Sequence, residues 1–171
     1  GEEATAFSKA LVINDFTRFA KLLVLLGASL SILLSTRFFD REKIARFEFA
    51  PLMVFATLGM LMMISAGGLM SLYVGLELQS LSLYVLAAFN RDSVKATEAG
   101  LKYFVLGALS SCLLLYGSSL IYGFSGTVAF DGIQTAVEGG RNLGVVIGIV
   151  FVMAGLAFKI SAVPFHMWTP D

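Results

Sequence analysis

Residues 69–89 read LMSLYVGLELQSLSLYVLAAF, an apolar run with one carboxylate, Glu77, near its centre. A helix needs about 20 mainly apolar residues to cross the roughly 30 Å hydrocarbon core of a membrane. This run is long enough, and Gly67 and Gly68 in front of it predict a tight reversal of the chain. The run therefore predicts a transmembrane helix that carries Glu77 close to mid-membrane depth.

The composition extends this conclusion to the whole chain. Of its 171 residues, 57% are apolar and 14% are charged. Charged residues make up about 25% of an ordinary soluble domain. The formal net charge is zero, so nothing indicates nucleic acid as a partner. The predicted fold class is an all-α integral membrane protein in contact with the lipid bilayer.

Four further apolar runs are long enough to span, so five transmembrane helices are expected. The other four lie at about residues 19–38, 49–67, 94–123 and 143–163. For the helix at 94–123, Asp92 or Ser93 is a suitable N-cap. The chain begins without a methionine and stops just after an apolar run, which predicts an interior piece of a longer membrane protein.

The segment at residues 125–141 has two possible interpretations. Phe130, Ile133 and Val137 stand at spacings of three and four, which suits a short helix lying in the membrane interface. A solvated loop with scattered apolar residues explains the segment nearly as well.

Basic residues near the helix ends predict the orientation, because loops rich in Lys and Arg stay in the cytoplasm. One side of the membrane collects Arg37, Arg41, Lys43, Arg46, Arg91 and Lys95. The other side has Lys9, Arg18, Lys21 and Arg141. The excess places the first group in the cytoplasm and makes the chain enter from outside.

Glu77 is the most informative ionisable residue. A charge near the centre of a bilayer costs about 2.5–3.5 kcal/mol on insertion scales, so such a residue is seldom idle. The carboxylate must be protonated or paired with a cation, and the neighbouring Gln79, Ser80 and Ser82 cannot neutralise it. We expect a role in proton transfer; the alternative is a structural acid hydrogen-bonded to a neighbouring helix.

Lys102 has two possible partners. Glu98 precedes it by four residues, the favourable order for an ion pair within one helix. If Ser93 caps the helix, Lys102 also lies far enough along it to face Glu77 on the preceding helix. The residues alone leave both arrangements open.

Lys159 and His166 are the remaining candidates. Lys159 follows a long apolar run, and Pro164 predicts a broken helix beside it, which is typical of transporters. The alternative is a lysine whose amine reaches the membrane surface. His166, the single histidine, suits a proton carrier at the mouth of a pathway or an interfacial hydrogen bond. The single cysteine, Cys112, excludes an internal disulfide and is expected to be a small buried residue.

Three stretches together resemble one family. They are GLELQSLSLYVL at 75–86, TEAGLKYFVLGA at 97–108 and FKISAVPFHMWTPD at 158–171. In combination they are similar to subunit N of the bacterial proton-pumping NADH–quinone oxidoreductase, respiratory complex I.

The resemblance implies an antiporter-like subunit, a class built from two inverted five-helix repeats with broken helices. Residues 1–48 would supply a peripheral helix with connectors, and residues 49–171 part of the first repeat. It also implies a proton relay in which Glu77 pairs with Lys102, followed by Lys159 at the broken helix and His166 beyond. No cofactor is expected in this chain, because flavin, iron–sulfur clusters and quinone sites would belong to other subunits.

The expected activity is therefore proton translocation coupled to quinone reduction, as one subunit of an oxidoreductase. The expected partners are the other membrane subunits of the complex, in a bacterial inner membrane rather than a mitochondrial one. Two rival hypotheses remain: a subunit of a multisubunit sodium/proton antiporter, and a purely structural membrane subunit.

Overall fold

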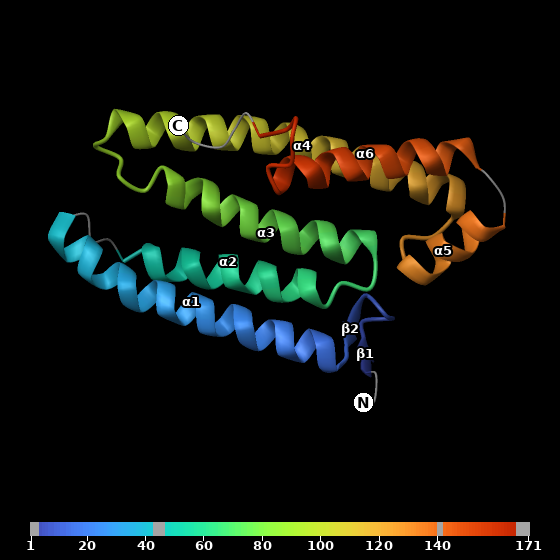
Figure 1. Cartoon of the computed structure of the whole chain (residues 1–171), viewed down its shortest axis with the longest axis horizontal. Coiled ribbons are helices and arrows are strands. Elements are labelled where there is room, and N and C mark those ends of the chain that lie inside the picture. The colour runs from blue at the N-terminus through green and yellow to red at the C-terminus, as the bar shows by residue number, and fades with distance from the viewer. Residues whose placement is uncertain (1–3, 43–46, 140–141, 167–171) are drawn as a thin grey trace.

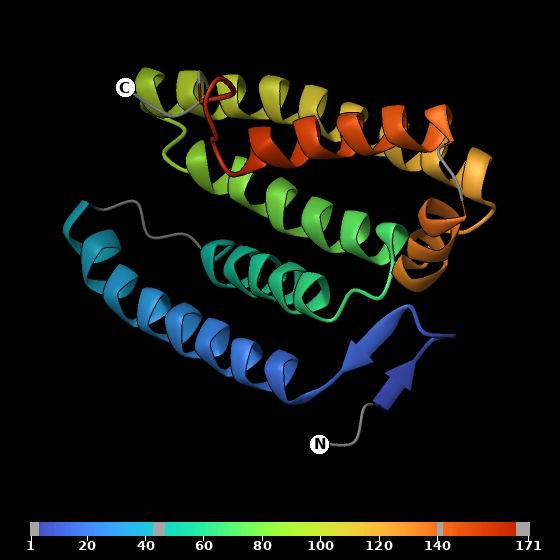
Figure 2. The ribbon, with the colours of Figure 1, turned by 45° about the vertical axis from the view of Figure 1, so that its right-hand side comes forward.

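The computed structural model describes residues 4–42, 47–139 and 142–166, which form a bundle of helices with a small hairpin at one end (Figure 1). The helices of this part are α1 (Asp15–Glu42), α2 (Phe49–Ile64), α3 (Leu69–Ala87), α4 (Val94–Ser125), α5 (Phe130–Glu138) and α6 (Leu143–Lys159). The hairpin strands are β1 (Ala4–Ala6) and β2 (Leu11–Ile13). The long helices lie side by side and reverse direction from one to the next, and α5 sits at the same end as the hairpin (Figure 2).

All five predicted apolar runs form helices, but their lengths differ. Among the described residues, α1, α3 and α4 are long and apolar enough to cross a membrane. Helices α2 and α6 have 16 and 17 residues, fewer than the roughly 20 that a full crossing needs. The structure is thus all-helical apart from the hairpin, and the expected count of five spanning helices is not reached by length.

Local capping sets where two helices begin. Asn14 and Thr17 exchange hydrogen bonds, from Thr17 N to Asn14 Oδ1 and from Asn14 N to Thr17 Oγ1, both at 2.9 Å. These reciprocal bonds start α1 at Asp15, earlier than the predicted residue 19. At α4, Ser93 accepts a hydrogen bond from the backbone N–H of Ala96, so the predicted start at residue 94 is confirmed, with Ser93 as the cap.

The N-terminal hairpin was not predicted. Its strands are antiparallel and pair Ala4 with Ile13, opposite each other across the ladder. The turn holds Phe7, Ser8 and Lys9 at positive φ, a conformation that usually selects glycine or asparagine. The sequence therefore carries no hairpin turn signal at this point, and its apolar residues alone do not identify two three-residue strands.

The reversal predicted at Gly67 and Gly68 is confirmed, and backbone bonds hold it from both sides. On one side Gly67 N donates to Ala10 O of the hairpin at 2.9 Å. On the other, Leu69 N donates to Val128 O at 2.8 Å, ahead of α5. A Cβ at Gly68 would approach Val128 O to 2.6 Å. Glycine is needed here because backbone fills the space on that flank.

Helices α2 and α3 approach each other closely through glycine. A Cβ at Gly59 of α2 would lie 2.6 Å from Gly75 O of α3, and one at Gly75 would lie 3.0 Å from Gly59 O. Gly117 of α4 and Gly148 of α6 make a similar contact. Small residues permit this backbone-to-backbone packing in membrane bundles.

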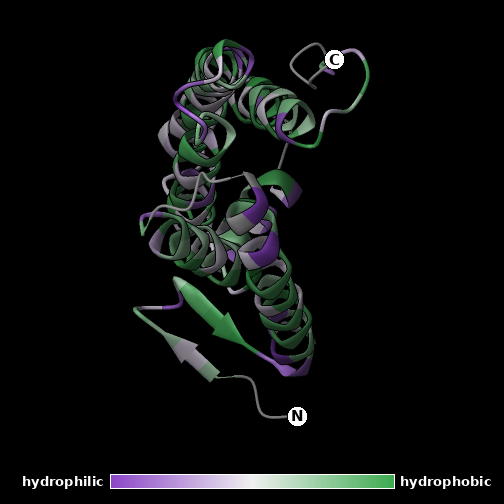
Figure 3. Ribbon diagram, turned by 90° about the vertical axis from the view of Figure 1, so that its left-hand side faces the viewer, coloured by the Kyte–Doolittle hydropathy of each residue, from purple (hydrophilic) through white to green (hydrophobic). Residues whose placement is uncertain are grey.

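Other surfaces of the helices stay apolar and exposed, and hydrophobic colouring dominates the helical ribbons in Figure 3. Leu33 and Leu34 of α1 are 67% and 74% exposed. Cys112 on α4 is also exposed, so the prediction that it is buried was wrong. Its neighbour Ser111 takes the face toward α3, which leaves Cys112 on another side of the helix.

The predicted grouping of basic residues agrees with the fold. Arg37 and Arg41 lie near the end of α1, and Arg91 lies between α3 and α4, at one end of the bundle (Figure 1). Lys9 lies in the hairpin turn and Arg18 near the start of α1, at the opposite end. Lys43, Arg46 and Arg141 lie outside the described residues. Which end faces the cytoplasm stays a prediction.

The segment at residues 125–141 contains a helix, α5, rather than only a loop. Its three apolar residues named above give it a one-sided character, and Ile133 packs on the buried cluster of Leu69, Ile121 and Val152. The segment is therefore helical, and its place in the membrane interface stays a prediction. Its position at one end of the bundle is visible in Figures 1 and 2.

Candidate functional site

Glu77, Ser80 and Tyr84 share one face of α3. Their spacings of three and four residues place each about one turn beyond the last. Ser80 and Tyr84 are buried, at 6% and 5% exposure, and the Glu77 side chain is 21% exposed. The opposite side of α3 packs on α2 through Gly75. The three polar side chains therefore point away from α2, into the space between α3, α4 and α6.

Lys159 of α6 enters this space and contacts all three side chains. Its Nζ donates to Ser80 Oγ at 3.1 Å and to Tyr84 Oη at 3.0 Å. The same nitrogen lies 3.7 Å from Glu77 Oε1 in an ion pair. A lysine ammonium has three N–H donors, and these three oxygens match that number. Only 12% of the Lys159 side chain is exposed, so the charges of Lys159 and Glu77 offset each other inside the bundle.

The end of α6 places Lys159 at this depth. Ala162 N donates to Ala157 O at 2.8 Å and Ser161 N donates to Phe158 O at 3.1 Å, which is the bond pattern of a Schellman motif. Ser161 has φ 55°, in the left-handed region. The helix thus ends at Lys159, and its end stops short of the far ends of α3 and α4 (Figure 1).

This turn corrects two sequence expectations. The helix does not continue to residue 163, and it is Ser161 at positive φ, not Pro164, that ends it. A Schellman turn uses up the last carbonyls of the helix, so the chain leaves the helical path before the proline is reached. A second half of the expected broken helix would fall on residues 167–171, which lie outside the described residues.

Helix α4 supplies a hydroxyl to Glu77. The Oγ of Ser111 donates to Glu77 Oε1, and it also lies 3.0 Å from the carbonyl oxygen of Gly107. Ser111 is 5% exposed. Tyr103, Gly107 and Ser111 are spaced by four residues, so one face of α4 meets the polar face of α3.

The Tyr84 ring is clamped between α4 and the lysine. A Cβ at Gly107 would overlap the Tyr84 hydroxyl, so the glycine leaves the space that this hydroxyl fills. The ring packs edge-on against Tyr103, with centroids 4.6 Å apart, and against Phe104 at 5.8 Å. Lys159 Nζ lies 5.6 Å from the ring centroid, on the side of the hydroxyl to which it donates.

Lys102 lies elsewhere. Its Nζ forms an ion pair with Glu98 Oε1 at 2.6 Å within α4, and both side chains are mostly exposed. Lys102 and Ser111 are nine residues apart, about two and a half helical turns, so they occupy opposite faces of α4. Since Ser111 faces Glu77, the early start of α4 does not turn Lys102 toward Glu77. The structure replaces the expected Glu77–Lys102 pair with Glu77–Lys159.

His166 is exposed and follows the turn after α6. Within the described part of the chain, no hydrogen bond or ion pair joins it to Glu77 or Lys159. The structure thus brings Glu77 and Lys159 together, and it leaves Lys102 and His166 at other positions.

Sequence reasoning missed the roles of Ser80, Tyr84 and Ser111. The signal for the first two was present: with Glu77 they stand at positions i, i+3 and i+7 of one apolar helix. Such spacing marks a polar stripe. Ser111 has no comparable signal, because its partner depends on how α4 is rotated against α3.

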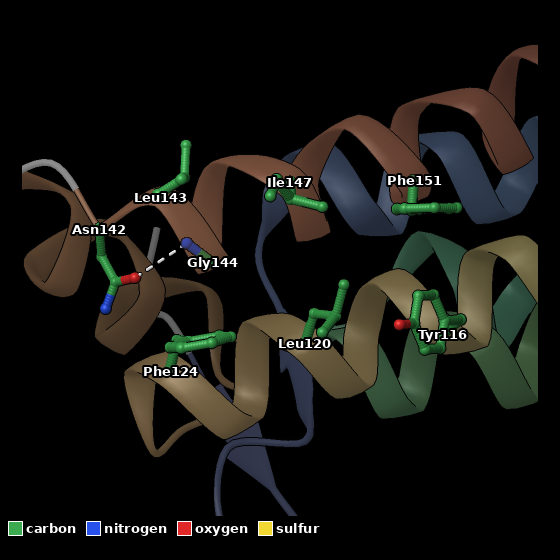
Figure 4. A pocket seen from close by; sticks show the side chains of 8 residues that line it. All are labelled: Tyr116, Leu120, Phe124, Asn142, Leu143, Gly144, Ile147 and Phe151. Atoms are coloured by element: carbon green, nitrogen blue, oxygen red, sulfur yellow. Dashed lines mark hydrogen bonds between the residues drawn. The ribbon is translucent and has the colours of Figure 1, made fainter.

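An apolar groove lies elsewhere, between α4 and α6 (Figure 4). Its lining is mainly apolar: Tyr116, Leu120, Phe124, Asn142, Leu143, Gly144, Ile147 and Phe151. Asn142 Oδ1 accepts a hydrogen bond from Gly144 N there, which caps α6. The groove shares no residue with the Glu77 site. In the described residues, no group of three His, Cys, Asp or Glu side chains is placed to hold a metal ion.

Residues 66–171 match the model of a protein family described as NADH:quinone oxidoreductase/Mrp antiporter, transmembrane. The match includes α3, α4 and α6, and hence Glu77, Ser111 and Lys159. The chain belongs to this family.

A curated relative within this family is the NADH-quinone oxidoreductase subunit N of Parvibaculum lavamentivorans, 65% identical over 166 residues. The aligned part covers 96% of this chain and 34% of the relative. The same protein of Beijerinckia indica is 62% identical over 169 residues, which cover 99% of this chain and 35% of that protein. The chain spans about a third of the length of the curated relatives it matches.

Solved structures agree with the sequence relatives. Respiratory complex I from Thermus thermophilus with bound Aureothin superposes with a TM-score of 0.80 and 32% identity, over 99% of this chain and 36% of that chain. The Mrp complex from Dietzia superposes with a TM-score of 0.74 and 30% identity, over 92% of this chain and 29% of that chain. The chain is therefore similar in fold to both complexes, and its high-identity relatives are named as subunit N.

Proposed function

We propose that this chain is part of a proton-translocating membrane subunit of NADH–quinone oxidoreductase, and that Glu77 and Lys159 form its proton-carrying pair. The observation that carries the proposal is the ion pair at 3.7 Å between two mostly buried side chains on apolar helices. The identity of 62–65% to proteins named NADH-quinone oxidoreductase subunit N supports it.

The energetic argument begins with the cost of burying charge. A single charge in the middle of a bilayer is expensive, and intramembrane acids and bases generally line ion or proton pathways. Here the carboxylate and the ammonium offset each other, and three hydroxyls complete their hydrogen bonds. Removing either charge leaves the other buried without its counter-charge, so the protonation of one group depends on that of the other.

That dependence is sufficient to move a proton. When Glu77 takes up a proton from one side, the ammonium of Lys159 loses its counter-charge and releases a proton to the other side. A change of about 1.4 kcal/mol in the interaction alters proton affinity tenfold. Loss of the proton from Glu77 and its recovery by Lys159 then restores the pair, and one proton has crossed it. Because the two sites are coupled, their titration belongs to the pair.

The remaining candidates take outer positions in this scheme. Lys102 with Glu98 lies in the second and third turns of α4, and His166 lies beyond the end of α6. We assign Lys102 to proton exchange at the end of the bundle nearer the start of α4. We assign His166 to proton exchange in the segment that follows α6. In this scheme Lys102 acts through a path separate from direct pairing with Glu77.

The whole subunit extends the proposal. Residues 1–48 supply the peripheral helix with its connectors, and residues 49–171 contribute to the first of two inverted repeats. The five apolar helices span the membrane together, with α6 as the first half of a broken helix. The subunit assembles with the other membrane subunits of complex I in a bacterial inner membrane. Flavin, iron–sulfur clusters and quinone belong to those other subunits.

The test uses sealed inverted membrane vesicles that carry the full-length subunit with Lys159→Ala. NADH-to-quinone turnover and vesicle acidification are recorded together, and Lys95→Ala, an exposed lysine in the first turn of α4, serves as the matched control. We expect Lys159→Ala to lose acidification while the complex stays assembled, and Lys95→Ala to keep it. Unchanged acidification in Lys159→Ala refutes the pair mechanism.

The same vesicles separate the two rival functions. The likeness to the Mrp complex favours a sodium/proton antiporter as the second candidate. An antiporter predicts acidity changes that follow an imposed sodium gradient and do not need NADH. A purely structural role predicts that Lys159→Ala and Glu77→Gln reduce assembly and leave the acidification per assembled complex unchanged.

A further inference from the structure

Ser111 stands between two acceptors. Its Oγ is in hydrogen-bonding distance of the Glu77 carboxylate and 3.0 Å from the carbonyl oxygen of Gly107. A serine hydroxyl carries one proton and two lone pairs. It can therefore donate well to one of these oxygens at a time, and it can accept a hydrogen bond while it donates.

We infer that Ser111 is a positioning residue whose hydroxyl reverses its hydrogen bond when Glu77 changes protonation state. With ionised Glu77, the Ser111 O–H donates to the carboxylate. With protonated Glu77, the new O–H on Oε1 donates to Ser111 Oγ, and the Ser111 proton turns to the Gly107 carbonyl. The carboxyl group gains one proton, the serine keeps its own, and no other bond forms or breaks. This inference rests on the proposed function, because it requires Glu77 to change protonation.

This reversal matters because the site is buried. Ser111 is 5% exposed, and a buried polar group that loses its partner is costly. The two orientations keep both the carboxyl group and the hydroxyl hydrogen-bonded in either state, using only atoms of α3 and α4. Ser111 thus lets Glu77 change its charge without leaving a buried polar group unsatisfied.

Other ionisable groups near Glu77 could also affect its protonation. Lys159 of α6 is its ion partner, and Tyr73 and Tyr84 are the titratable side chains of α3 near it. From α4, Cys112 is the titratable side chain near Tyr73. Helix α2, which packs on the opposite side of α3, has no ionisable side chain. Ser111 is therefore the hydroxyl of α4 whose loss acts on Glu77 directly.

Charged acceptors make stronger hydrogen bonds than neutral ones, so losing the Ser111 hydroxyl weakens the ionised form of Glu77 more than the acid form. A difference of this kind corresponds to about a tenfold change in proton affinity, or one pH unit. The acid form also loses the acceptor for its O–H, which moves its carbonyl stretching band to higher frequency.

Ser118 is the matched control. It lies two turns further along α4, is 7% exposed and donates to Leu114 O at 2.8 Å. This is the same bond to the carbonyl four residues back that Ser111 has available. Ser118→Ala therefore removes a buried serine from α4 without removing a partner of Glu77.

The experiment is an infrared pH titration of the purified, assembled complex with the full-length subunit. The carboxylic acid band that Glu77→Gln removes is assigned to Glu77 and followed in Ser111→Ala, Ser111→Cys and Ser118→Ala. We expect the band to rise in frequency and its midpoint to move up by about one pH unit in Ser111→Ala. Ser111→Cys, with a weak donor of similar size, is expected to shift it the same way. Ser118→Ala is expected to match the parent complex.

Each outcome bears on a different claim. A band and midpoint in both Ser111 variants equal to the parent complex refute the inference while Glu77 stays a titrating residue. The same shift in Ser118→Ala also refutes it, because a general loosening of α4 would then be the cause. If Glu77→Gln removes no band and leaves acidification intact, the proposed function fails, and the inference fails with it.

Discussion

Lys159, the last residue of α6, lies 3.7 Å from Glu77 in the middle of α3, so the ion pair joins two helices that are distant in sequence. Two hydroxyls of α3, on Ser80 and Tyr84, lie nearer to the ammonium than the carboxylate does. The ammonium of Lys159 is therefore positioned by one face of α3. Its charge interacts with Glu77, but Ser80 and Tyr84 also fix its position.

This relationship predicts strong coupling between Glu77 and Lys159. In a double-mutant cycle, Glu77→Gln and Lys159→Met each leave a charge without its counter-charge, which costs about 3–5 kcal/mol for a buried pair. The double variant has neither charge, so we expect its loss of stability to be about 1–3 kcal/mol smaller than the sum of the losses in the two single variants. The measurement is the denaturation midpoint of the assembled membrane complex.

The corresponding cycle with Lys102→Met is the control. Lys102 pairs with Glu98 on the opposite face of α4, so Glu77→Gln and Lys102→Met should be additive within about 0.5 kcal/mol. A larger coupling of Glu77 to Lys102 than to Lys159 would contradict the arrangement of the two pairs.

Gly107→Ala tests the position of Tyr84. The added Cβ overlaps the Tyr84 hydroxyl, and the ring cannot move aside freely because Tyr103 and Phe104 pack on its edges. We expect a loss of about 1–3 kcal/mol of stability, as for other overpacked cores, and weaker proton pumping per NADH oxidised. Gly123→Ala, in the same helix but with open space around the glycine, should instead keep pumping and gain slightly in helix stability.

Adding Tyr84→Phe to Gly107→Ala makes this prediction sharper. The hydroxyl is the atom nearest to the added Cβ, and the ring carbons that remain are further away. The second change should therefore recover part of the lost stability but not the pumping, because Lys159 then lacks the Tyr84 oxygen. Equal stability of the single and double variants would show that the overlap is relieved in another way.

The sequence predicts the helices well because hydropathy and capping act locally. The five apolar runs, the Ser93 cap and the reversal at Gly67 and Gly68 all follow from residues within a turn or two of each other. The partner of Glu77 does not follow. The helices here are apolar on most sides, so the sequence says little about how each one is rotated about its axis.

Rotation explains why the contacts at the site were hard to predict. The depth of Glu77 could be predicted because it depends only on the place of Glu77 in α3. The residues left the partner of Lys102 open and the family resemblance implied Glu77, whereas the face of α4 that meets α3 is the one with Gly107 and Ser111. The pairing of Lys159 with Glu77 required knowing where α6 ends, and that depends on a turn around Ser161 with no sequence signal.

Gly68→Ala tests the backbone hydrogen bonds that hold the reversal between α2 and α3. Its Cβ would approach Val128 O to 2.6 Å, and that oxygen accepts from Leu69 N at 2.8 Å. Backbone cannot move away without breaking this bond, so we expect a loss of more than about 1 kcal/mol and faster amide exchange at Leu69. Gly139→Ala at the end of α5 meets only ordinary contacts, at 3.5 Å and beyond, and should have little effect. Similar losses of stability in both variants would contradict the close contact between Gly68 and Val128 O.

Ser161→Gly tests what ends α6 beside Lys159. Ser161 has φ 55°, and a left-handed residue other than glycine costs about 1–2 kcal/mol. Glycine avoids this cost but loses about 0.4–1 kcal/mol through the freedom it gives the unfolded chain, which leaves a gain of about 0.5–1 kcal/mol. The Schellman bond from Ala162 N to Ala157 O should open less often, so amide exchange at Ala162 should slow by about two- to fivefold. Ser161→Ala keeps the Cβ and should show no slowing; equal slowing in both variants would mean that a lost hydroxyl, rather than relieved backbone strain, stabilises the turn.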